Sequence, residues 1–161
     1  MPINKIIDKL IQISKNKHRY VSITLGIQKN LSMYIEQGRT ENIAKQIELK
    51  DKYLSRVQKM DMDFYALFSE LKLSLGVDSI DKINGKKYPQ LKELKKIVGE
   101  IIKLNEEIDI IDSQNTKILT KDMGETSNKL RGIKQGRRAA NAYKAQKNIV
   151  KSLSQHRKKS Q

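Results

Sequence analysis

The most regular feature of this chain is the spacing of its apolar residues, which alternates between three and four positions over three long stretches. In the first stretch, the ten positions on this ladder are Ile3, Ile6, Leu10, Ile13, Lys17, Tyr20, Thr24, Ile27, Leu31 and Tyr34. Eight of these ten residues are apolar, and Lys17 and Thr24 are the exceptions. Such spacing places side chains on one side of an α-helix and is typical of a seam buried against other helices. The pattern predicts a helix over residues 3–37, approximately.

Two further ladders repeat this spacing. The second consists of Ile43, Ile47, Lys50, Leu54, Val57, Asp61, Phe64, Phe68, Leu71 and Leu75. Eight of these ten residues are again apolar, and Lys50 and Asp61 are the exceptions. The third consists of Leu91, Leu94, Val98, Ile101, Leu104, Ile108, Ile111, Asn115 and Ile118. They predict helices over residues 41–75 and 90–123, and no strand-like alternation of useful length accompanies them.

Turn-forming residues separate the three predicted helices. Gly38 provides a stop after the first, and Thr40 is a candidate N-cap for the second. The linker 76–89 carries an Asn-Gly turn, is expected to hold one short helical turn within residues 78–83, and ends in Pro89, which suits the first position of a helix. Short connections favour antiparallel neighbours. The predicted fold class is therefore all-α, with residues 1–123 forming an elongated antiparallel bundle or coiled coil of three long helices.

Charge is distributed unevenly along the chain. Residues 126–161 carry eleven Lys or Arg and no Asp or Glu, so residues 1–125 hold the other 22 basic and all 18 acidic residues. We therefore expect residues 124–161 to form a basic, partly helical C-terminal tail, with Ala139, Tyr143 and Val150 on one face. The chain has no cysteine and no apolar run of about 18 residues, which favours a cytoplasmic protein without membrane insertion.

Candidate catalytic groups are sparse. His18 and His156 have no neighbours with metal-ligand spacing and are expected to be solvated. Asp61 and Asp63 point about 200° apart on a helix and lack the further ligands of a calcium loop. The acidic run 106–112 is interpreted as a solvated helix face. With no nucleophile–base arrangement in view, we expect a protein that is not an enzyme and that needs neither metal nor cofactor.

Two asparagines interrupt the third ladder. Asn105 and Asn115 lie ten residues apart, beside or within its apolar positions. One interpretation is that they are polar positions that set the register of a helical seam. The other is that they belong to a pattern shared with a known family.

That second interpretation rests on three segments. Leu104-Asn105-Glu106-Glu107, the N-x-x-[LI]-[LI] step from Asn115 to Leu119, and the basic segment from Lys134 to Tyr143 resemble the FlgN-type flagellar export chaperones. The first half of the chain matches that family in helix length and period only. The related filament-cap chaperones share the helical body, so the resemblance leaves these two classes open.

The resemblance implies a cytoplasmic chaperone without ATPase activity that holds hook–filament junction (hook-associated) proteins and delivers them to the flagellar type III export gate. It places client binding on Asn115, Ile118, Leu119, Met123, Leu130, Ile133, Ala139, Tyr143 and Val150. Tyr143 is also a candidate contact with an export-gate component. Basic residues around this stripe would steer an acidic partner: Arg131, Lys134, Arg137, Arg138, Lys144 and Lys147.

Other functions would use the same tail. Its eleven cations could neutralise phosphates, which makes a nucleic-acid-binding or ribosome-associated helical protein the main alternative. Contact with an anionic membrane is a third hypothesis, which the absence of Trp, Phe and Leu anchors on the apolar face disfavours. Two further expectations are a solvated tail that binds no partner and self-association of the protein.

Overall fold

The computed structural model describes residues 1–121 of the chain. In this part it contains three long α-helices: α1 (Ile3–Glu36), α2 (Thr40–Leu75) and α3 (Leu91–Lys121). A single 3₁₀ turn, η1 (Ile80–Lys82), lies in the linker where a short helical turn is expected. No strand occurs in the described residues, which confirms the all-helical prediction there. The five helix ends that can be compared differ from the expected ones by at most one residue.

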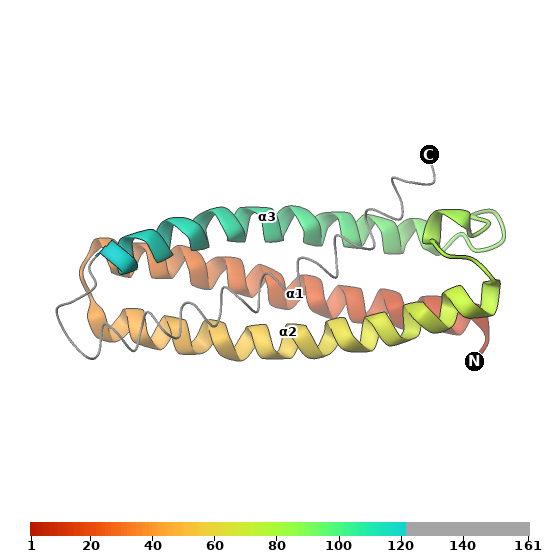
Figure 1. Ribbon diagram of the computed structural model, residues 1–161, viewed down its shortest axis with the longest axis horizontal. Coiled ribbons are helices and arrows are strands. Elements are labelled where there is room, and N and C mark those ends of the chain that lie inside the picture. Colours follow the sequence, from red (N-terminus) through yellow and green to blue (C-terminus); the bar gives the residue numbers. More distant parts are fainter. Residues whose placement is uncertain (122–161) are drawn as a thin grey trace.

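The three helices run up, down and up along one elongated body, and α1 lies between the other two (Figure 1). α1 packs along both α2 and α3, whereas α2 and α3 pack on each other very little. The sequence of α1 explains its central place, because neighbouring positions such as Ile6, Ile7, Leu10 and Ile11 are all buried. Such an arc is wider than the single stripe that one helical neighbour requires.

The predicted seams form the core. Most of its fully buried members are aliphatic residues, and they come from every helix, among them Ile6, Leu10, Leu54, Leu71 and Leu94, each at most 1% exposed. The buried aromatic side chains of the described residues lie near the end of the body that holds the linker. The rings of Phe64 and Phe68 lie 6.0 Å apart, and Tyr88 from the linker joins the same cluster.

Glycines end the first two helices in left-handed conformations that side chains with a Cβ disfavour. Gly38 has φ 68° and Gly76 has φ 64°. At Gly76, the amides of Gly76 and Val77 donate to the carbonyls of Leu73 and Lys72, which satisfies helix-end acceptors.

Two expected cap positions are wrong by one or two residues. Thr40 is the first residue of α2 rather than its N-cap, which is Arg39 and has no side-chain cap hydrogen bond. Pro89 lies two residues before Leu91, the first residue of α3. The amide of Leu91 donates to the carbonyl of Tyr88 at 3.2 Å, so a tight turn precedes the regular helix.

Candidate protein-binding surface and the buried polar network

Five polar residues interrupt the apolar ladders, and all five are buried. Lys17, Thr24, Lys50, Asp61 and Asn115 are each at most 6% exposed. Removing charged and polar groups from water is costly unless they find hydrogen-bond partners. The interruptions therefore mark places where the bundle builds polar contacts in its interior.

The larger of these contacts is a network that joins all three helices. The Lys50 ammonium on α2 and the Gln28 amide on α1 both donate to Oδ1 of Asp112 on α3, each at 2.8 Å. Asn115, one turn further along α3, donates from Nδ2 to the Gln28 side-chain oxygen at 3.1 Å. The Ser32 hydroxyl lies 2.9 Å from Oδ1 of Asn115. Because each member satisfies another, the network holds the three helices in one axial register.

The second contact is an isolated ion pair between α1 and α2. Nζ of Lys17 lies 2.5 Å from Oδ1 of Asp61, and the two side chains are 7% and 3% exposed. Burial raises the pKa of Asp61 and lowers the pKa of Lys17, and the attraction between the two charges only partly opposes these shifts. Oδ2 of Asp61 is buried and has no hydrogen-bond partner among the described residues.

The structure corrects one interpretation of the acidic sequences. Asp61 is buried, as its place on the second ladder implies, and it faces Lys17 in the core. Asp112, in contrast, is not on a solvated face, since it accepts from Lys50 and Gln28. Glu106 and Glu107 of the same run are exposed as expected. His18, expected to be solvated, is partly exposed and lies 3.3 Å from Glu100 on α3.

The sequence-predicted client contacts on α3 are placed differently from one another. Asn115 is 3% exposed and is committed to Gln28 and Ser32, so as a surface contact this prediction is wrong and the register-setting interpretation describes it. Ile118 is 46% exposed, and Leu119 is half-buried. These two residues therefore carry the accessible apolar part of the predicted site in the described chain.

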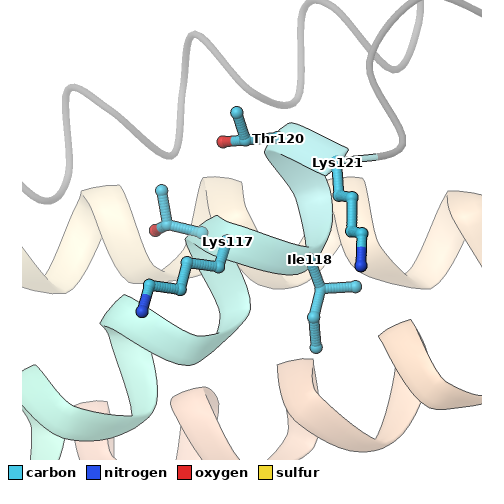
Figure 2. Close-up of a pocket in the computed structure, with 5 residues that line it drawn as sticks. Lys117, Ile118, Thr120 and Lys121 are labelled. Atoms are coloured by element: carbon cyan, nitrogen blue, oxygen red, sulfur yellow. The ribbon is translucent and has the colours of Figure 1, made fainter.

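A hollow lies beside the last two turns of α3. The described residues that line it are Thr116, Lys117, Ile118, Thr120 and Lys121. Figure 2 shows Ile118 and Lys121 extending toward the same side of the last turn. An apolar side chain flanked by lysines fits an amphipathic partner that carries acidic residues beside its apolar stripe.

The other predicted contacts lie outside the described residues. These are the apolar positions Met123, Leu130, Ile133, Ala139, Tyr143 and Val150, and the basic positions Arg131, Lys134, Arg137, Arg138, Lys144 and Lys147. Within residues 1–121, no group of three or more His, Asp or Glu side chains could hold a metal ion. Among the described helices, none combines the length and apolar character needed to cross a bilayer.

Gln28 and Asp112 are network members that the ladders did not single out. Gln28 lies one position after the ladder residue Ile27, and Asp112 one position after Ile111. Both therefore lie beside a predicted seam, at positions where a polar residue is usually solvated. The one feature of the sequence that could have indicated a buried polar partner is Lys50. A lysine on a seam requires an acidic partner at the same level of the bundle.

Comparisons of this chain with models of known protein families, with curated proteins and with solved structures found no match.

Proposed function

We propose that this protein is a non-enzymatic, cytoplasmic export chaperone of the FlgN type, which binds hook–filament junction proteins and delivers them to the flagellar export gate. One observation carries the proposal. No position of the α3 seam is exposed from Leu91 to Asn115, and the seam then becomes accessible at Ile118, shortly before the basic segment begins. An apolar stripe that is unfinished at the end of a helix supports binding of a partner helix.

Charge would give this surface its preference among partners. Lys117 and Lys121 flank Ile118, and residues 126–161 add eleven cations and no anions. A client helix with acidic residues beside its apolar stripe would be attracted and oriented by them. The client's own apolar residues would then cover Ile118, Leu119 and the apolar positions that follow.

The experiment compares two exposed isoleucines of the same helix. Ile118→Asp removes the accessible end of the stripe, whereas Ile110→Asp is a matched control at a residue that is 61% exposed and outside the proposed contact. Binding of a purified hook-associated protein C-terminal helix is measured by titration calorimetry. We expect Ile118→Asp to weaken binding at least about tenfold and Ile110→Asp to change it by less than about twofold.

Equal affinities of the two variants would contradict the proposal. Salt separates the main alternative, nucleic-acid binding. Affinity for a nucleic acid should fall linearly on logarithmic axes as salt rises, whereas an apolar helix contact should depend on salt much less. Strong, steeply salt-dependent binding of a duplex or single strand together with no client binding would favour the alternative.

A further inference from the structure

The contacts that α2 and α3 make with the central helix α1 show which flank of each of these two helices is turned toward α1. The opposite flank of each has no neighbour among the three described helices. On α2, the ring of Tyr53 lies 5.7 Å from Tyr20 of α1. On α3, Glu100 and Glu107 pair with His18 and Lys29 of α1. At about 100° per residue, Tyr65 of α2 and Ile102 of α3 lie on the opposite side of each buried stripe. Because α2 and α3 pack little on each other, neither helix covers the opposite flank of the other.

We call these two flanks the α2–α3 face and define it by Asp51, Met62 and Tyr65 on α2 and by Ile102 and Asp109 on α3. Met62 is 71% exposed and Tyr65 is 58% exposed, while Ile102 is half-buried. The face thus presents apolar side chains along its middle and an acidic residue on each helix toward the end where α3 terminates.

Asn105 provides a second observation at this face. It lies three residues after Ile102 and four before Asp109, on the same side of α3. The residue is 5% exposed, yet its Nδ2 and Oδ1 atoms both lack a hydrogen-bond partner among the residues that the structure describes. A buried amide with no partner is rare in folded proteins and indicates that a polar group is to be supplied there.

We propose that residues 134–153 of this chain bind the α2–α3 face as a fourth helix and supply the hydrogen-bond partner of Asn105. The chain continues for forty residues after Lys121, which is long enough to return along α3. Gly124 favours a break directly after α3, and a short connection favours an antiparallel return. In a helix, Ala139, Tyr143 and Val150 of this segment would share one face, as an apolar stripe for burial.

Charge and register agree with this occupant. Residues 126–161 have eleven basic and no acidic residues, which complements Asp51 and Asp109. With a turn centred near residue 125, antiparallel pairing places Lys144 within about one helical turn of Asp109 and Arg138 roughly level with Asp51. The same register brings Gln146 near Asn105, where one amide can both donate to and accept from the other.

The absence of cysteine makes a distance test straightforward in the full-length chain. Met62→Cys is combined with Ser152→Cys, and the pair is treated with a short bis-maleimide. The matched control combines Asp63→Cys with Ser152→Cys, because Asp63 is exposed at the same level but about 100° around α2. We expect at least about fivefold more intrachain product from the Met62 pair, since docking raises the effective concentration of its thiols.

Equal yields from the two pairs would overturn the inference, and a predominantly interchain product would show that a second copy occupies the face instead. A further variant tests the charge contact. Asp51→Asn in the Met62 pair should lower the yield about threefold, and Asp63→Asn should not. Circular dichroism checks that each variant keeps its helices.

The proposed client contact uses the same apolar stripe, so a client is expected to compete with the α2–α3 face. No client is present in the crosslinking experiment. Client binding without crosslinking would therefore refute the fourth helix alone, and crosslinking without client binding would refute only the proposed function.

Discussion

Two buried lysine–aspartate pairs of similar geometry are embedded in very different surroundings. Lys17–Asp61 joins α1 to α2 at 2.5 Å, and one oxygen of Asp61 has no partner within the described residues. Lys50–Asp112 joins α2 to α3 at 2.8 Å, and Gln28 from α1 donates to the same carboxylate oxygen. The first pair stands alone, while the second is part of a network.

The difference separates two consequences of placing charges in a helical core. An isolated buried pair rarely recovers its desolvation cost and can often be replaced by apolar residues without loss of stability. A connected network depends on every member, because removing one leaves the others buried without partners. We therefore expect Lys50–Asp112 to be much harder to replace than Lys17–Asp61.

The largest expected effect follows from Asp112→Ala. This substitution leaves the buried Lys50 ammonium and the Gln28 amide without their shared acceptor. Breaking a buried pair in this way costs about 3–5 kcal/mol of unfolding free energy. Urea unfolding followed by circular dichroism measures it, with the exposed Asp63→Ala as a control that should change stability by less than about 0.5 kcal/mol. A loss below about 1 kcal/mol would show that the network contributes little.

The second prediction compares two double replacements by apolar residues. Lys17→Met with Asp61→Leu removes the isolated pair and should leave stability unchanged or raise it by about 1–4 kcal/mol. Lys50→Met with Asp112→Leu should instead cost about 1–3 kcal/mol, because the Gln28 amide remains buried without its acceptor. Urea unfolding of both variants measures the difference. Equal shifts would contradict the distinction between the pair and the network.

The third prediction uses the pH dependence of the isolated pair. Burial raises the pKa of Asp61, so the native state binds a proton at pH values where the unfolded chain has released it. Stability from this group therefore grows as pH falls from the raised pKa toward the usual value of about 4. The wild type should gain stability relative to Asp61→Asn as the pH is lowered from about 7 to about 4. Urea midpoints at several pH values test the sign, and a relative loss at low pH would refute it.

Much of the helical body could be predicted from the sequence, because the spacing of apolar residues directly specifies which side of a helix is buried. None of the ladder residues of α1 and α2 is exposed, and the glycine ends follow from backbone conformation. Buried charge could not be predicted in the same way. Asp112 and Glu106 belong to one acidic run, and it is Asp112 that meets Lys50 of another helix and is buried.

The candidate site was less predictable than the fold. The segment from Asn115 to Leu119 near the end of α3 does not by itself reveal whether each residue faces the core or a partner. Asn115 faces Gln28, whereas Ile118 is exposed only three residues later. That distinction depends on how far α1 and α2 extend beside α3, and contacts between helices that are distant in sequence determine this extent.

The smallest expected effect concerns Ser32, at the edge of the network. Its hydroxyl lies 3.1 Å from the Gln28 carbonyl and 2.9 Å from Oδ1 of Asn115, but its single hydrogen can serve only one of these acceptors at a time. Ser32 is half-buried, so water can partly replace the lost donor, and Ser32→Ala should cost only about 1 kcal/mol. Ser22→Ala is the matched control, since that exposed hydroxyl donates to the His18 carbonyl of its own helix. If Ser32→Ala destabilised the protein as much as Asp112→Ala, the network would be centred on Asn115 rather than on the carboxylate.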